Sequence, residues 1–223
     1  MGKVIISGAC PLMTAPKAGT PLSTYTEGSI IKINENGSPV EFYVAKHDYE
    51  AGLNGAGRTL VVRKDCYDKR AWNSSDKNAY ATSTIDGWLN STYKSLFSVS
   101  VHNAISTTKF KYTVGYGNVS VDTLERAIFL LSCTELGGGS QSWFNVEGSA
   151  LEKADMLKIA YINGSAIGQW TRSPDTNNAE SAVYFTSTGN IQASVCTNNS
   201  YGVRPCFTLP STIKIDENGQ VIE

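Results

Sequence analysis

The strongest constraint on the fold is a turn signal that separates two alternating apolar runs near the start of the chain. Ile31 and Ile33 lead into Asn36-Gly37, and apolar residues alternate with polar ones again over residues 40–44. Successive strand side chains point to opposite faces, and Asn-Gly favours the left-handed turn that joins two antiparallel strands. Residues 30–44 are therefore predicted to form a β-hairpin.

A nearly identical heptapeptide recurs close to the other end of the chain. Residues 213–219 differ from residues 31–37 only in having Asp216 where the first copy has Asn34. Seven residues are too few to indicate a duplicated domain, because turn chemistry alone selects such residues. We expect two similar hairpins, one near each end.

The remaining pattern combines short strands with few helices. Ser83 is a suitable N-cap for an amphipathic helix over about residues 84–94, and residues 101–105 are compatible with a second, shorter helix. The apolar run at residues 127–131 is predicted to be a central buried strand. Further short strands are expected at residues 59–63, at residues 109–114 and from residue 159 onward, which favours an α+β fold.

Two regions are expected along the chain. Pro11, Pro16 and Pro21 disfavour regular structure, so residues 1–27 are predicted to form an extended N-terminal arm. Residues 28–223 are predicted to form one domain, which is long enough to bury a core.

Charge and hydropathy exclude several partner classes. The formal net charge is −1, charged residues make up only 17% of the chain, and basic residues form no long run, so nucleic acid is not an expected partner. The apolar stretches are shorter than the ~18 residues of a membrane span, so membrane insertion is not expected. The apolar run at residues 4–6 is too short for a signal peptide, which predicts synthesis in the cytosol without cleavable-signal secretion.

The residues that usually carry catalysis are sparse. Five widely spaced cysteines and two histidines do not form a zinc pattern, so the thiols are predicted to be small buried groups. The sequence does not decide whether Cys196 and Cys206 form a disulfide. His47 is expected in a solvated loop. The sequence does not position Glu135, Glu147 and Glu152 relative to one another. We expect no cofactor, no metal and no enzymatic activity.

The stretch from Trp170 to Phe207 has the composition of a binding face. Apart from Arg172 and Arg204, which lie near its two ends, Asp175 and Glu180 are its only charged residues. Aromatic residues and asparagine are frequent. Tyr and Trp supply rigid contact area, and Ser, Gly and Asn supply adaptable hydrogen bonds. Turns in a loop-rich β region use the same polar residues, so composition leaves both interpretations open. The predicted ligand contacts are Trp170, Asp175, Asn177, Asn178, Tyr184, Asn198, Asn199 and Tyr201.

The two arginines near the ends of this stretch have a separate expected role. Arg172 and Arg204 each lie beside a proline-containing turn. We favour a structural role, in which they bridge loops to backbone carbonyls, over direct contact with an acidic or glycan ligand.

Several short motifs occur in a characteristic order: residues 88–90, 129–132, 147–149, 170–174 and 202–207. In these motifs the chain resembles an uncharacterised domain family of Firmicutes bacteria and their phages and prophages, related to the C-type-lectin-like superfamily that includes the formylglycine-generating enzymes. The resemblance covers about Gly28 to Glu223. It implies a C-type-lectin-like fold with short antiparallel sheets, one or two helices and long loops, in which the terminal strands pair and an irregular loop region presents a ligand face.

The resemblance also implies a role. The chain is expected to be a virion protein, displayed on a tail, fibre or capsid, that binds a host cell-surface glycan or protein. The arm is expected to contact other virion proteins, and a homo-oligomer, such as the trimers common in these assemblies, is compatible with this location. One alternative is a capsid or tail decoration protein without a host ligand. A formylglycine-generating-like enzyme is a second alternative, but the family's closely spaced cysteine pair is replaced by Cys196 and Cys206, with nine residues between them.

Overall fold

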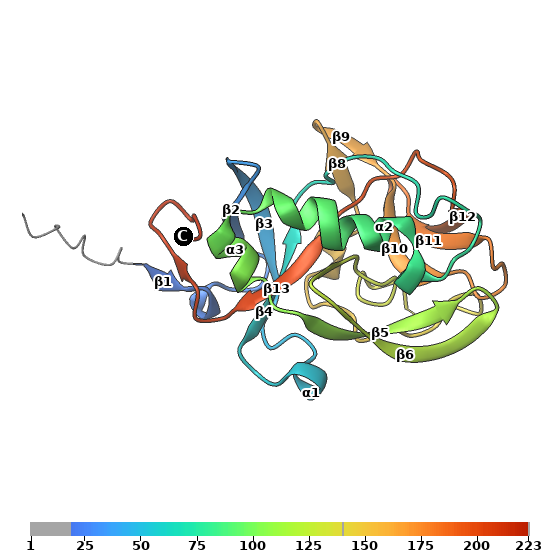
Figure 1. Ribbon diagram of the computed structural model, residues 1–223, viewed down its shortest axis with the longest axis horizontal. Helices are drawn as coiled ribbons and strands as arrows, with labels where there is room; N and C mark the ends of the chain where they lie inside the picture. The colour runs from blue at the N-terminus through green and yellow to red at the C-terminus, as the bar shows by residue number, and fades with distance from the viewer. Residues whose placement is uncertain (1–18, 140, 223) are drawn as a thin grey trace, which may run out of the picture.

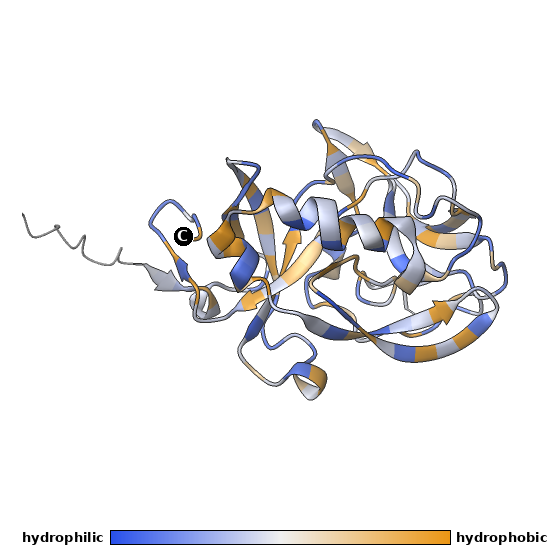
Figure 2. Ribbon diagram, viewed as in Figure 1, coloured by the Kyte–Doolittle hydropathy of each residue, from blue (hydrophilic) through white to orange (hydrophobic). Residues whose placement is uncertain are grey.

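A five-stranded antiparallel sheet forms the centre of the molecule (Figure 1). The computed structural model describes residues 19–139 and 141–222. The sheet has the order β2–β3–β4–β13–β7, with strands β2 (Ile30–Glu35), β3 (Ser38–Lys46), β4 (Arg58–Arg63), β13 (Cys206–Pro210) and β7 (Ile128–Phe129). Figure 2 shows hydrophobic residues along its strands and hydrophilic residues in many connecting loops. The fold is thus mixed α and β, with mainly small antiparallel sheets and few helices.

The predicted N-terminal hairpin is confirmed. β2 and β3 pair from Ile30↔Tyr43 to Glu35↔Ser38. Asn36 and Gly37 make the turn with φ of 51° and 75°, the left-handed conformation that fits the twist of the adjoining strands.

The second hairpin lies beside the first. Strand β14 (Lys214–Ile215) leads into a turn, and Ile215 bridges back to Val221. The N–H of Lys32 donates to the carbonyl of Gly219 at 2.7 Å, and the N–H of Val221 donates to the carbonyl of Lys32 at 2.9 Å. The two similar sequences therefore meet at the outer edge of β2, which is covered by backbone hydrogen bonds.

Residues 19–27 are packed against the domain, in contrast to the predicted extended arm. Strand β1 (Thr20–Pro21) pairs antiparallel with β14, and the side chain of Leu22 is fully buried. Pro21 is tolerated because a short edge strand does not require its missing N–H. The packed unit thus begins before Gly28, and residues 1–18 of the predicted arm lie outside the described residues.

His47 lies in the turn after β3, as predicted, but it is half-buried and helps to hold this N-terminal segment, so the predicted solvation is wrong. Its Nε2 lies 2.6 Å from the carbonyl oxygen of Tyr25, and its Nδ1 lies 2.9 Å from the hydroxyl of Thr59. The ring is half-buried between β4 and the segment before β2.

The predicted helix over residues 84–94 is confirmed as a continuous helical run. Helix α2 (Thr84–Trp88) continues into a π-helical turn (Leu89–Tyr93) and a 3-10 turn (Lys94–Leu96). The Ser83 hydroxyl accepts the N–H of Asp86 and caps the run. Two shorter helices are α1 (Ala51–Asn54) and α3 (Val99–Ala104), and 3-10 turns occur at Leu22–Thr24, Tyr80–Thr82 and Ala154–Leu157.

The helical run packs on the central sheet through aromatic rings. Tyr93 contacts Phe97 with ring centroids 5.5 Å apart, and Phe97 contacts Phe207 of β13 at 5.2 Å. Phe207 also contacts Phe42 of β3 at 5.4 Å. Trp88 is half-buried, and the Arg70 guanidinium lies 3.7 Å from its ring centroid.

Three smaller sheets complete the described chain. β5 (Thr108–Gly115) pairs with β6 (Asn118–Arg126), and β8 (Ala160–Ile162) pairs with β9 (Ser165–Ile167). β10 (Gln169–Pro174), β11 (Ser181–Phe185) and β12 (Ile191–Val195) form a three-stranded sheet. β1 and the C-terminal residues lie at one end of the molecule, and β10–β12 lie at the other (Figure 1).

The predicted central strand at residues 127–131 is instead an edge strand. Only Ile128 and Phe129 pair, and β7 lies at the end of the five-stranded order. The whole run is nevertheless buried, because Phe110 of β5 stacks on Phe129 with centroids 4.4 Å apart. The apolar sequence of residues 127–131 therefore predicted their burial correctly, but it did not predict the position of the strand within the sheet.

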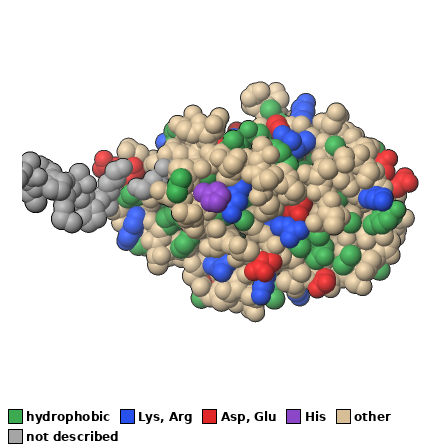
Figure 3. Space-filling model, viewed as in Figure 1, with side chains coloured by type: hydrophobic (Ala, Val, Ile, Leu, Met, Phe, Trp, Pro, Cys, Tyr) green, Lys and Arg blue, Asp and Glu red, His purple; other side chains and the backbone are tan. Residues whose placement is uncertain are grey.

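The surface carries few charges. Charged side chains are scattered over the face in Figure 3, without a large patch of one sign. Among the described residues, no helix is both long enough and apolar enough to cross a membrane.

Replacement of Leu22 tests whether the N-terminal segment is part of the core. Leu22→Ala is expected to lower the free energy of unfolding by about 2–5 kcal/mol, because a fully buried leucine leaves a cavity. Chemical denaturation measures the change, and Ser23→Ala, at an exposed neighbouring position, is the control. A Leu22→Ala protein as stable as the control would show that this segment is not packed.

Asp86 provides a test of burial at the start of the helical run. Burial raises the pKa of Asp86 to about 6, although the guanidinium of Arg126, 2.7 Å away, acts in the opposite direction. A raised carboxyl pKa means that the folded state binds the proton more tightly, so the contribution of Asp86 to stability decreases as pH rises from about 4 to about 6. The wild type should lose up to about 3 kcal/mol relative to Asp86→Asn over this range, as measured by denaturation at each pH. A pH-independent difference between the two proteins would contradict the raised pKa.

Candidate functional site

Two half-buried tyrosines from the predicted binding stretch stack on each other at the three-stranded sheet. The ring centroids of Tyr184 and Tyr201 lie 3.9 Å apart, with an interplanar angle of 27°. Trp170 contacts both rings edge-on, at 5.8 and 4.8 Å. Tyr184 and Tyr201 are referred to below as the tyrosine platform.

Trp170 supports this platform from the interior and is not itself exposed. Only 2% of Trp170 is accessible, and its indole N–H donates to the carbonyl of Arg70 at 3.0 Å. The predicted direct ligand contact by Trp170 is therefore wrong. Its polar group is satisfied inside the protein, and the ring is held beneath the two tyrosines.

The position of Tyr201 depends on a close approach to Gly168. A Cβ atom at Gly168 would lie 2.8 Å from the Tyr201 ring, which is shorter than side-chain contacts allow. The backbone of Tyr201 is also fixed, because its carbonyl accepts the N–H of Arg70 at 3.1 Å. Burial, together with the hydrogen bond to Tyr201, raises the pKa of Tyr184 to about 12, so its hydroxyl is neutral at physiological pH.

Uncharged polar side chains border the platform. In the β11–β12 register, Gln192 lies opposite Tyr184, and Ser194 lies opposite Ala182. Residues two apart on a strand share a face, so both side chains are on the platform side. The Asn198 amide donates to the Ser194 hydroxyl at 3.1 Å and extends this border.

Most of the predicted polar contacts have a turn-forming role. The Asp175, Asn178 and Asn198 side-chain oxygens each accept a backbone N–H two residues ahead, at 2.8, 3.0 and 2.9 Å. These are Asx turns, the structural alternative that composition left open. Asn177 and Asn199 are exposed beside them.

Both asparagine-containing loops lie at the same end of the sheet. The N–H of Cys196 donates to the carbonyl of Glu180 at 2.8 Å and joins the two loops. The buried Asn78 amide donates to the carbonyls of Asp175, Asn178 and Ser181, at 2.8 to 3.0 Å. Asn78, which is distant in sequence, was not predicted to shape this site.

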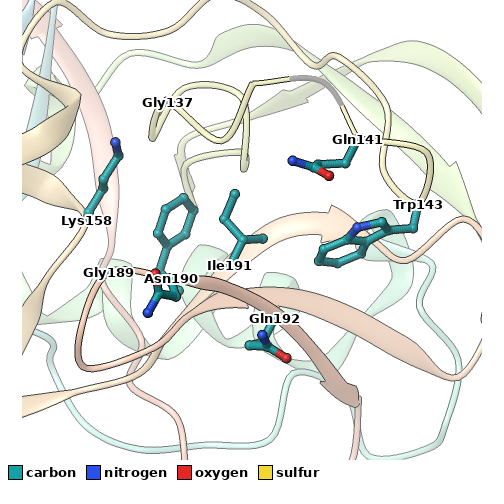
Figure 4. A pocket seen from close by; sticks show the side chains of 9 residues that line it. Gly137, Gln141, Trp143, Lys158, Gly189, Asn190, Ile191 and Gln192 are labelled. Carbon is teal, nitrogen blue, oxygen red and sulfur yellow. The ribbon is translucent and has the colours of Figure 1, made fainter.

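A pocket of about 480 Å³ lies at the other end of β12. We call it the β12 pocket, and its lining comprises Gly137, Gln141, Trp143, Lys158, Phe185, Gly189, Asn190, Ile191 and Gln192. Figure 4 shows Trp143 and Lys158 on opposite sides, with Ile191 between them and Gln141 beside Trp143. None of these residues was predicted as a contact. The available signal was a tryptophan, Trp143, within a polar, glycine-rich segment.

Contacts from several elements hold the β12 pocket in shape. The carbonyl of Trp143 accepts the N–H of Thr176 at 2.9 Å, and its ring meets Phe144 edge-on at 5.1 Å. Added Cβ atoms at Gly137 and Gly189 would lie 3.4 and 3.5 Å from Lys158 carbons, so the lysine stem passes close to both glycines. The Lys158 ammonium pairs with Asp155 at 2.6 Å.

Glu135 and Glu147, which the sequence did not position, meet Arg172 in the interior. All three residues are fully buried. Arg172 Nη1 donates to Glu135 Oε2 at 2.6 Å, and the Tyr49 hydroxyl donates to Glu135 Oε1 at 2.5 Å. Glu147 accepts hydrogen bonds from the Ser173 hydroxyl and the Thr113 N–H, both at 2.6 Å, and burial raises its pKa. Full burial separates these carboxylates from any substrate in solvent, so the group has the geometry of a structural ion network.

The predicted structural role of both arginines is confirmed. Arg172 donates to the carbonyls of Lys111 and Leu130 at 3.0 and 2.9 Å. Arg204 donates to the carbonyls of Arg63, Leu157 and Lys64 at 2.8, 2.7 and 2.5 Å. Each guanidinium thus joins loops and strands that are far apart in sequence.

The described cysteines are unpaired and buried, as predicted for small structural thiols. Cys66, Cys133, Cys196 and Cys206 are free, so Cys196 and Cys206 do not form a disulfide, and Cys10 lies outside the described residues. Burial raises the pKa of Cys196 to about 12 and that of Cys206 well above its ordinary value. Burial therefore opposes formation of the thiolate that a nucleophile requires. Within residues 19–139 and 141–222, no group of three or more His, Cys, Asp and Glu side chains is arranged to hold a metal.

Removal of one partner tests the buried ion network. Arg172→Met is expected to lower the free energy of unfolding by about 3–5 kcal/mol, because Glu135 remains charged and buried without its partner. The double variant Arg172→Met/Glu135→Gln should recover part of this loss in a denaturation cycle. Lys64→Met, which breaks an exposed pair with Glu41, is the control and should cost about 1 kcal/mol or less. Additive effects of Arg172→Met and Glu135→Gln would show that the pair is not coupled.

Comparison with known proteins gives a family but no named relative. Neither the curated proteins nor the solved structures contain a match to this chain. The sequence profile of a family described as a domain of unknown function, DUF6273, matches residues 56–211. This range runs from β4 to the end of β13 and includes the tyrosine platform, the β12 pocket and the Arg172 network. The chain belongs to the DUF6273 family.

Proposed function

We propose that the chain is a non-enzymatic recognition module of a phage or prophage virion, built on a C-type-lectin-like scaffold. In this proposal it binds a host cell-surface glycan or protein through the end of the molecule that carries β10–β12. The arm, residues 1–18 together with the packed segment 19–27, would join it to other virion proteins.

The arrangement of the chain supports the scaffold part of the proposal. Strands near the two ends of the described chain, β1 and β14, pair with each other, which is the pairing expected of a C-type-lectin-like fold. The opposite end of the molecule carries the irregular loops around β10–β12 (Figure 1). The proposed ligand-binding end would therefore lie opposite the end of the molecule where β1 and β14 pair.

The tyrosine platform is the observation that carries the proposal. Two stacked, half-buried rings supported by Trp170 offer contact area at little entropic cost, since their positions are already fixed. The border of Gln192, Ser194 and Asn198 adds hydrogen-bonding groups without charge. Such a surface recognises polar, uncharged groups such as sugar hydroxyls or peptide amides.

A capsid or tail decoration protein is the second candidate, and the β5–β6 hairpin favours it. Strand β6 pairs with β5 on one edge, and no strand covers its other edge in the described structure. Tyr116, Val119, Val121 and Val146 expose between 42% and 55% of their surface around this hairpin. An open edge with apolar side chains suits assembly with another virion protein.

Single substitutions in the platform test host recognition. Tyr184→Ala and Tyr201→Ala should each weaken adsorption of the purified protein to host cells by roughly tenfold or more, as expected for anchor residues. Gly168→Ala should weaken adsorption too, because its new Cβ displaces the Tyr201 ring. Tyr161→Ala, which removes an exposed tyrosine from β8, is the matched control and should adsorb as the wild type does. Wild-type adsorption by all three platform variants, each still folded, would contradict the proposed site.

Particle binding separates the two candidate roles. A decoration protein should attach to virions that lack it and ignore host cells, whereas a recognition module should bind cells as an isolated protein. Truncation of residues 1–18 should abolish attachment to virions and leave cell binding intact. Loss of cell binding on this truncation, with the fold preserved, would place the recognition surface in the arm.

A further inference from the structure

The β12 pocket extends the binding end of the molecule to a second face of the same sheet. Tyr184 and Phe185 are consecutive on β11, so their side chains point to opposite faces. Tyr184 belongs to the platform, whereas Phe185 and Ile191 line the pocket. Figure 4 shows Gln192 on the side of the β12 ribbon away from Ile191, which is the face that carries Tyr184.

We propose that the β12 pocket binds one neutral pyranose ring of a host glycan, stacked on the indole of Trp143. This inference names a ligand class for the binding end described above and therefore rests on the proposed function. It adds a site that is separate from the tyrosine platform.

The size and openness of the pocket fit a single sugar unit. Its volume of about 480 Å³ lies in the range of small-molecule sites, roughly 300–1,000 Å³. The exposed amide of Gln141 and the half-exposed ring of Trp143 stand at its rim. A ring within a longer glycan could enter while its neighbours remain in solvent.

The chemistry of the lining matches the two kinds of surface on a pyranose. The C–H face of the sugar is apolar and suits the flat indole of Trp143 and the side chain of Ile191. Its hydroxyls need donors and acceptors together, and the amides of Gln141 and Asn190 each offer both. No carboxylate belongs to the described lining, so a cationic ligand lacks a partner there.

The ion pair that Lys158 already makes favours a neutral sugar over an acidic one. Its ammonium is the cation of the described lining, and it already pairs with Asp155 at 2.6 Å. Asp155 is ionised at neutral pH, and the hydrogen bond and charge of the lysine lower the pKa of its carboxyl further. A carboxylated or phosphorylated sugar would have to compete with this carboxylate for the same ammonium.

Trp143 is held firmly enough to act as a stacking surface for a sugar. Its ring meets the buried Phe144 edge-on at 5.1 Å, and its carbonyl is held by the N–H of Thr176. The ring is therefore positioned before a ligand arrives, which lowers the entropy cost of stacking.

Direct titration with sugars tests the proposal. The indole N–H signal of Trp143 in a ¹⁵N-labelled sample is assigned by its loss in Trp143→Phe. Methyl glycosides of glucose, galactose, N-acetylglucosamine and N-acetylgalactosamine are then added, and at least one should shift this signal saturably. Binding to variants is followed through the backbone amide signals that the same glycoside shifts. Trp143→Ala should weaken that binding at least tenfold, whereas Tyr161→Ala, at an exposed tyrosine outside the pocket, should bind as the wild type does.

A second arm of the titration examines ligand charge. Glucuronic acid and glucose 6-phosphate should bind no more tightly than the best neutral glycoside, and Lys158→Met should change neutral binding less than threefold. The neutral-ring inference is overturned if only the acidic sugars bind and Lys158→Met abolishes that binding. It is also overturned if none of the glycosides shifts the Trp143 signal, or if Trp143→Ala binds the glycoside as the wild type does.

Cell adsorption keeps this inference distinguishable from the proposed function. If Tyr201→Ala weakens adsorption to host cells and Trp143→Ala does not, host recognition stands and the pocket inference fails for the natural ligand. If the wild type ignores host cells but binds a glycoside through Trp143, the pocket is a sugar site and the proposed host recognition fails.

Discussion

The buried guanidinium of Arg172 holds together the two halves of the described structure. It extends from β10 and donates to Glu135, to the carbonyl of Leu130 after β7, and to the carbonyl of Lys111 in β5. Phe110 packs against it, with the guanidinium carbon 4.6 Å from the ring centroid. Desolvation of these charges is costly, and only an arrangement that pairs them is tolerated. The network therefore favours one orientation of the β10–β12 sheet relative to the central sheet.

The candidate binding surfaces depend on this fixed orientation. Trp170 precedes Arg172 by two residues in β10 and lies beneath the tyrosine platform. Gly137, in the lining of the β12 pocket, follows Glu135 of the ion network by two residues. Internal hydrogen bonds from Asn78 and the Asx turns fix the loops between these points. A ligand of the proposed kind would therefore meet a surface that is already ordered. Because this surface has few charges, the proposed recognition would depend more on contact and hydrogen bonding than on electrostatic attraction over a distance.

Prediction from the sequence succeeded where local chemistry decides the outcome. The Asn36-Gly37 turn and the Ser83 cap both act on their immediate neighbours, and both were predicted correctly. Pro21 and Trp170 were misjudged, because proline also fits an edge strand and because the indole N–H bonds to a carbonyl 100 residues away in sequence. The β12 pocket was missed entirely, since its walls come from segments around Trp143, Lys158 and Ile191 that only the fold brings together.

The sequence by itself determined the mixed α and β class, the two hairpins, the helical run, the low charge and the aromatic, asparagine-rich stretch near the C-terminal end. These properties depend on residue type and on contacts between near neighbours. Only the tertiary structure decided which of those aromatics are exposed and which asparagine side chains are used in turns. It also decided that Glu135 pairs with Arg172 and that Glu147 is buried near this pair. The physical reason is that burial and hydrogen-bond partners are set by residues distant in sequence, so the same tyrosine or carboxylate has no fixed role until the chain has folded around it.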